Sequence, residues 1–113
     1  MSDTKEPKTY LKDIESAIEK IEKYTKGMNF GKFKESELVV DGVIRNLGII
    51  GEAVKSIPDE FKEKNKEIEW KKIAGFRDVL IHSYANVDLE IVWDVVSNKL
   101  GNLKSIVRRE LKP

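Results

Sequence analysis

Residues 39–58 read VVDGVIRNLGIIGEAVKSIP and carry a regular apolar pattern. This pattern recurs every three or four residues, at Val40, Val43, Leu47, Ile50, Val54 and Ile57. The spacing places these side chains on one face of an α-helix that continues for about five turns. Pro58 ends the helix, because proline lacks the amide hydrogen that a further turn needs. We therefore expect one long amphipathic helix with a buried face.

The segment before this helix has the same spacing. We expect a helix from about Pro7 to Lys26, because proline suits a first helical turn and Gly27 suits a helix end. Its inward-facing side chains are predicted to be Leu11, Ile14, Ile18 and Ile21. A loop from Met28 to Lys34 would connect the two helices.

Two further long helices are expected after Pro58. A short turn of helix and a lysine-rich loop to Lys66 come first, and the next helix opens near Ile68. Asp88 is a plausible N-cap of the last helix. The apolar faces are Trp70, Ile73, Phe76 and Leu80 in one helix and Trp93, Val96, Leu100, Leu103 and Val107 in the other. No convincing alternating strand pattern is found. The sequence predicts an all-α, antiparallel up-and-down bundle of four long helices plus a short connecting helix.

Length and composition limit the possible functions. The 113 residues suit a single domain, residues 1–113, with one core. The chain has no cysteine and one histidine, which excludes disulfides, thiol nucleophiles and multi-histidine metal sites within one chain. We expect no metal and no cofactor. The net charge of +1 implies that any contact with RNA is local. A polar N-terminus and the lack of a long apolar run predict a cytoplasmic protein without membrane contact.

Residues 77–84, RDVLIHSY, contain the single histidine. His82 can take and give a proton near neutral pH, and the guanidinium of Arg77 matches a phosphate. Metal-independent RNA cleavage needs a base at the attacking hydroxyl and an acid at the leaving oxygen. It also needs a positive group beside the negatively charged phosphorane. One histidine per chain cannot serve both ends of the reaction. The composition therefore points to a homodimer that combines Arg77 and His82 of both copies in one site.

Two acidic residues are candidates for supporting roles. Asp78 directly follows the arginine, where its carboxylate would repel a phosphate or raise the pKa of His82. Glu52 shares a helical face with Arg45 and Gly48, and the missing side chain at Gly48 would allow a helix or ligand to approach. Tight packing within the chain is the alternative explanation for this glycine.

Several segments together resemble one protein family. Arg77-x4-His82-x-Tyr84 is preceded by WKKIAGF at 70–76 and followed by VDLEIVW at 87–93, and IIGEA occurs at 49–53. This set is similar to the HepT branch of the HEPN-domain proteins. The resemblance implies a dimeric RNase toxin of a type VII-like toxin–antitoxin system, with RNA as substrate and a minimal nucleotidyltransferase as antitoxin. It also implies that Arg77 and His82 form the active-site pair and that the antitoxin adenylylates Tyr84.

Other roles for these residues stay open. His82 could cap a helix end, Arg77 could pair with Asp78, and Tyr84 could simply bury its ring. The alternative function is a non-catalytic helical interaction or nucleotide-binding module that retains the HEPN fold. Asp78 and the near-neutral net charge are the features that favour this alternative.

Overall fold

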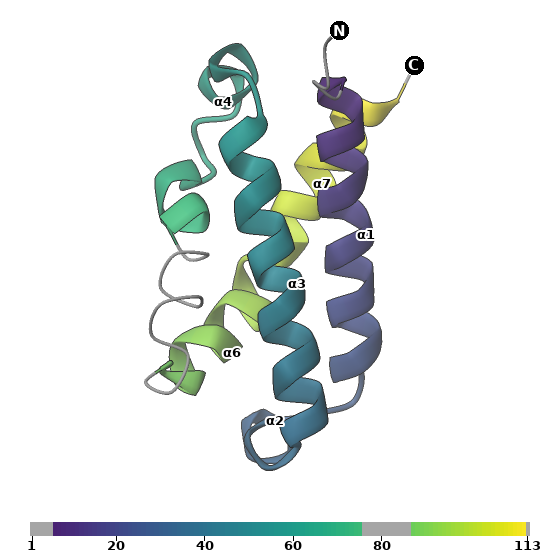
Figure 1. Cartoon of the computed structure of the whole chain (residues 1–113), viewed down its shortest axis with the longest axis vertical. Helices are drawn as coiled ribbons and strands as arrows, with labels where there is room; N and C mark the ends of the chain where they lie inside the picture. The colour runs from purple at the N-terminus through teal and green to yellow at the C-terminus, as the bar shows by residue number, and fades with distance from the viewer. Residues whose placement is uncertain (1–5, 76–86, 113) are drawn as a thin grey trace, which may run out of the picture.

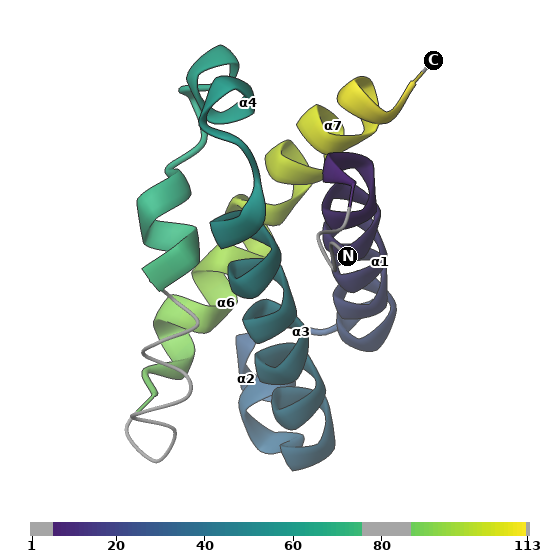
Figure 2. The same cartoon turned by 45° about the horizontal axis from the view of Figure 1, so that its top comes forward.

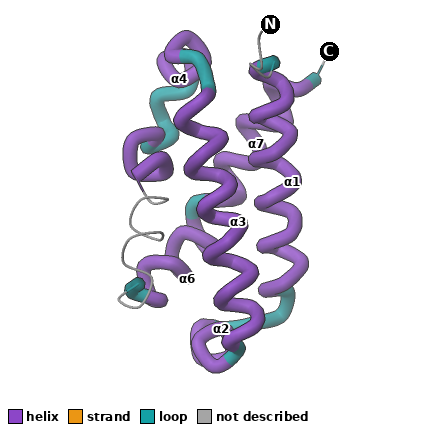
Figure 3. The backbone as a smooth tube through the Cα atoms, viewed as in Figure 1, coloured by secondary structure: helices purple, strands orange, loops and turns teal. Residues whose placement is uncertain are grey.

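The computed structural model describes residues 6–75 and 87–112 of the chain. Throughout these two ranges the regular structure is helical and strands are absent (Figure 3). The helices are α1 (Pro7–Thr25), α2 (Phe30–Glu35), α3 (Glu37–Ser56), α4 (Asp59–Lys64), α6 (Leu89–Asn98) and α7 (Leu100–Leu111), and residues 70–75 are also helical. The prediction of an all-α helical bundle is confirmed.

The two longest helices, α1 and α3, run side by side in opposite directions along the long axis of the molecule (Figure 1). Pro7 occupies the first turn of α1 as predicted, and Gly27 follows its end with a φ of 77°. This left-handed backbone conformation is one that glycine adopts without steric cost. Ser36 caps α3 by accepting a hydrogen bond from the Val39 amide. None of the helices in the described ranges is both long and apolar enough to cross a membrane.

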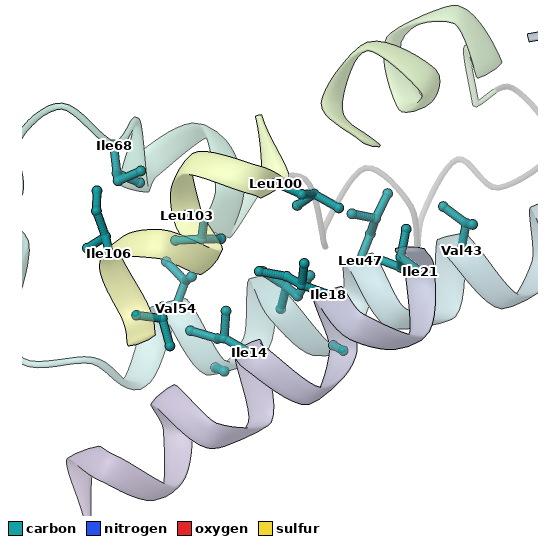
Figure 4. Packing of buried hydrophobic residues seen from close by; sticks show 14 of the residues in the cluster. Ile14, Ile18, Ile21, Val43, Leu47, Val54, Ile68, Leu100, Leu103 and Ile106 are labelled. Carbon is teal, nitrogen blue, oxygen red and sulfur yellow. The ribbon is translucent and has the colours of Figure 1, made fainter. Parts of the chain in front are cut away.

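The predicted apolar faces of α1 and α3 form the core. Ile14, Ile18 and Ile21 of α1 are completely buried, and each contributes about 1.5–3 kcal/mol by leaving water. Figure 4 shows α1 and α3 side chains gathered with those of the last helix. The members that the figure labels are Ile14, Ile18, Ile21, Val43, Leu47, Val54, Ile68, Leu100, Leu103 and Ile106.

Ion pairs also fasten α7 to α1 at the surface. The guanidinium of Arg108 donates to Glu15 at 2.9 Å and to Glu19 at 2.6 Å, and these carboxylates raise its pKa. The ammonium of Lys104 donates to Glu22 at 2.7 Å. Lys104 and Arg108 therefore join α7 to α1 at the surface.

The predicted loop from Met28 to Lys34 is wrong, because most of it forms the short helix α2. The side chain of Asn29 accepts a hydrogen bond from the Lys32 amide at 2.9 Å and so caps the helix. Phe33 is fully buried, with its ring centroid 4.9 Å from that of Trp93. Packing of this one side chain stabilises a helix that is too short to form alone.

The last predicted helix is present but divided. Asp88 caps α6 as expected, by accepting a hydrogen bond from the Glu90 amide at 2.9 Å. The helix is interrupted at Lys99, between α6 and α7. Gly101 and the asparagines on either side of the break have low helix propensity, which lowers the cost of the interruption. The short helix expected after Pro58 is confirmed as α4.

Candidate functional site

Most of the site predicted from the sequence lies outside the described residues. Arg77, Asp78, His82 and Tyr84 all fall within residues 76–86, as do the expected core residues Phe76 and Leu80. Their roles therefore stay predictions. The structure does describe both flanks of this segment, which are the helical residues 70–75 and α6.

Glu52 is the one predicted site residue that the structure describes. It is exposed on α3, where Ile50 faces the core. At about 100° per residue, Glu52 lies roughly 160° around the helix from Ile50. The side chain of Glu52 thus projects from the opposite side of α3, and its supporting role stays a prediction.

Trp70 anchors the segment before the motif. Its indole nitrogen donates to the backbone carbonyl of Lys62 at 3.2 Å and to that of Asn65 at 3.0 Å. Its ring meets Phe61 edge-on, with 5.7 Å between the centroids. Trp70 is only 8% exposed, which confirms the prediction that it faces inward.

Asn65 connects this anchor to α7. Its amide donates to the carbonyl of Phe61 at 3.0 Å, and its side-chain oxygen accepts from Arg109 at 2.6 Å. Asn65 is 1% exposed, and both ends of its amide are paired, as a buried polar group requires. The sequence analysis missed this residue, because no local pattern indicates a partner 44 positions away.

A pocket of about 420 Å³ lies between residues 70–75 and α6. Figure 2 shows these two helical segments on the same side of α3. The apolar part of the lining comes from α3, α6, α7 and the segment around residue 70, and consists of Leu47, Ile50, Ile68, Ile73, Ile91, Val95 and Leu100. The polar part consists of Glu67, Glu69, Lys72, Asp94, Asn98, Lys99 and Asn102.

Ion pairs centred on Glu69 join two sides of this pocket. Its carboxylate binds Lys72 at 2.9 Å and Lys99 at 3.5 Å. The hydrogen bond and charge of Lys72 lower the pKa of Glu69, with a smaller contribution from Lys99. In turn, Glu69 raises the pKa of Lys72. The three-residue spacing of Glu69 and Lys72 is readable from the sequence, whereas the contact with Lys99 depends on the fold.

The described part of the pocket has binding features but few catalytic ones. Its ammonium groups are paired with a carboxylate, and the rest of its lining is apolar, acidic or amide. In the described ranges, no three His, Cys, Asp or Glu side chains meet in a group that could hold a metal ion.

Comparison with known proteins gives the family. Residues 14–110 match the model of the family described as "Ribonuclease HepT-like". The chain belongs to the HepT-like ribonuclease family. The resemblance noted in the sequence is thus confirmed, and the matched residues of this HepT-like chain include the whole segment 77–84.

Relatives of this HepT-like chain carry related names. "Putative RNase TTE0752" of Caldanaerobacter subterraneus subsp. tengcongensis is 38% identical over 108 residues, covering 96% of both chains. "Probable ribonuclease HepT" of Thermococcus cleftensis is 44% identical over 97 residues, covering 86% of this chain and 88% of the relative.

A longer relative matches this chain over part of its own length. "Gamma-glutamylcyclotransferase and putative RNase MJ0434" of Methanocaldococcus jannaschii is 46% identical over 100 residues. These cover 88% of this chain but only 45% of that relative, so the chain spans less than half of its length. No solved structure was found to match the chain.

Proposed function

We propose that this HepT-like chain is the toxin of a toxin–antitoxin pair and acts as a metal-independent endoribonuclease. The observation that carries the proposal is the family match over residues 14–110, which contains the chain's only histidine five positions after an arginine. The relatives named as ribonucleases are consistent with RNA as the substrate.

In the proposed reaction, the 2′-hydroxyl of RNA attacks the neighbouring phosphate and displaces the 5′-oxygen of the next nucleotide. His82 of one copy removes the proton from the attacking hydroxyl, and His82 of the second copy donates a proton to the leaving oxygen. The guanidinium of Arg77 stabilises the negative charge that builds up on the phosphorane. A homodimer with a shared cleft supplies both histidines.

Control of this activity is proposed to act through Tyr84. A nucleotidyltransferase antitoxin would transfer AMP to its hydroxyl, two residues beyond His82. The added phosphate would pair with Arg77 and occupy the space that the RNA phosphate needs. Asp78 is proposed to tune the pKa of His82, and Glu52 to support the cleft from α3.

The test is cleavage of RNA by the purified protein in the presence of a chelator. We expect cleavage by the parent protein, and a loss of about 10²-fold or more in His82→Ala and Arg77→Ala. Lys12→Ala, which removes an exposed cation from α1, is the matched control and should cleave like the parent. Equal cleavage by all four proteins would show that the motif is not the active site. An inactive parent that still binds nucleotide or RNA would support the non-catalytic alternative.

A further inference from the structure

The segment that leads toward the motif is held by few buried side chains. Of residues 58–75, all of which the structure describes, three are buried, namely Asn65, Ile68 and Trp70. Helix α4 lies in this range and buries no side chain. Apolar burial therefore contributes less to the placement of this segment than it does in α1 or α3, and the polar contacts of its buried residues become correspondingly important.

Asn65 is the centre of these polar contacts, because each of its hydrogen-bonding groups has a partner. Its backbone amide and its side-chain amide donate to carbonyls of α4, at 3.2 and 3.0 Å. Its backbone carbonyl accepts from the amide of Ile68 at 3.1 Å and from the indole of Trp70 at 3.0 Å. Its side-chain oxygen accepts from Arg109 at 2.6 Å. These bonds, the Asn65 joint, connect α4, Trp70 and α7.

Arg109 reaches the Asn65 joint from α7, and α7 has other contacts that hold it in place. Its buried face packs in the core, and the neighbouring Arg108 binds Glu15 and Glu19 of α1. Successive residues of a helix lie about 100° apart, so Arg108 and Arg109 project toward different parts of the molecule. Loss of Arg109 would therefore leave α7 on α1, but the side-chain oxygen of Asn65, which is 1% exposed, would lose its donor.

We propose that Arg109 is a positioning residue for the proposed ribonuclease site. Through the joint at Asn65 it fixes where the helical residues 70–75 begin, and these precede the motif at residues 77–84. The proposal rests on the proposed function for one premise, that the motif holds the reacting groups. A displacement of about 1 Å at a reacting group can reduce the rate about 10²-fold. Arg109 can therefore affect catalysis without touching RNA.

The experiment measures RNA cleavage by Arg109→Ala and by the matched control Arg108→Ala. Alanine has the highest helix propensity, so both variants should keep the helical circular dichroism of the parent. We expect kcat to fall at least about tenfold in Arg109→Ala while KM stays within about twofold of the parent, because Arg109 acts on the geometry of the site and not on the binding of RNA. Arg108→Ala should cleave RNA like the parent.

A third variant tests the hydrogen bond itself. Arg109→Lys keeps a long side chain with a donor for the side-chain oxygen of Asn65, so it should recover most of the kcat. A raised KM with a parent-like kcat in Arg109→Ala would show that Arg109 binds RNA directly, and would overturn the positioning role. Equal losses of kcat in Arg108→Ala and Arg109→Ala would also overturn it, since they would indicate a general weakening of α7.

NMR separates this proposal from the proposed function. In Arg109→Ala, the resonances of the Trp70 indole N–H and of the amides of residues 77–84 should shift, while those of α1 should stay at their parent positions. If the parent never cleaves RNA, the ribonuclease is refuted, and these shifts would still uphold the action of Arg109 on the motif. Parent-like resonances at residues 77–84 would overturn the positioning role whether or not the protein cleaves RNA.

Discussion

The indole nitrogen of Trp70 donates a hydrogen bond to the backbone carbonyl of Asn65, 3.0 Å away. The same nitrogen also reaches the carbonyl of Lys62, so a single donor binds one carbonyl in the last turn of α4 and one directly after that helix. Trp70→Phe would keep an apolar ring but remove this donor. We expect it to lower the free energy of unfolding by about 1–3 kcal/mol, measured by urea denaturation at fixed protein concentration.

The control for Trp70 is Trp93→Phe. Trp93 contacts the ring of Phe33 and is only partly buried, so phenylalanine should preserve much of its packing. The loss of stability should be smaller than for Trp70→Phe. Equal losses in the two variants would mean that the hydrogen bonds of Trp70 contribute little.

Two glycines of α3 should respond differently to replacement by alanine. A Cβ at Gly48 would meet no atom within 4 Å, whereas one at Gly42 would lie 3.1 Å from the Tyr24 ring. Gly48→Ala should raise the free energy of unfolding by about 0.5–1 kcal/mol, because alanine suits a helix interior better. Gly42→Ala should gain less or lose stability, since the ring must move. Thermal denaturation of both variants checks this order, and a Gly42→Ala variant that is more stable than Gly48→Ala would contradict it.

The ion pair of Glu69 and Lys72 predicts a measurable change in titration. Lys72→Met should raise the pKa of Glu69 toward its ordinary value of 4.5, as followed by NMR of the side-chain carboxyl carbon. Lys71→Met, which removes the exposed neighbouring ammonium, should leave that pKa nearly unchanged. A similar rise in both variants would indicate a general effect of charge rather than a specific pair.

The directions of the pKa shifts of Glu69 and Lys72 determine how the contribution of this pair to stability depends on pH. Because the pKa of Glu69 is lowered, its contribution to stability is present above pH 4.5 and is lost as the pH falls through the lowered pKa. The pKa of Lys72 is raised, so its contribution is present below pH 10.5 and is lost as the pH rises through the raised pKa. The pair should thus stabilise the protein throughout the neutral range.

Modification of Tyr84 is the prediction that concerns control. Incubation with the cognate nucleotidyltransferase and ATP should add the mass of one or more AMP groups to Tyr84 and reduce RNA cleavage without unfolding the protein. Tyr84→Phe should cleave RNA like the parent and escape this modification. Mass spectra that show unmodified Tyr84 after reaction with an active transferase would refute the proposal.

Apolar spacing was enough to predict the parts of the fold that long helices dominate. Ile14 and Ile18 of α1 and Leu47 of α3 are buried as the pattern requires, because periodicity directly reports which face leaves water. Asp88 was predicted as a cap because capping depends on neighbouring residues in the chain. Helix α2 was missed, since its stability depends on the distant contact between Phe33 and Trp93.

The surroundings of the site were less predictable than its motif. The order of Arg77, His82 and Tyr84 is visible in the sequence, and so is the Glu69–Lys72 spacing. The pocket near Ile91 is formed by segments from both halves of the chain, and the interruption at Lys99 helps to set their direction. Such a hollow depends on the angles between helices, which a one-dimensional pattern does not specify.

The interruption at Lys99 divides the end of the chain into two parts with different tolerance to mutation. Helix α7 is fixed to α1 by a buried face and by the ion pairs of Arg108, so damage there should reduce the amount of folded protein. Helix α6 borders the pocket and follows the motif, so substitutions on its exposed face should leave the core intact. The fold should therefore tolerate more substitutions on the exposed face of α6 than on the buried face of α7.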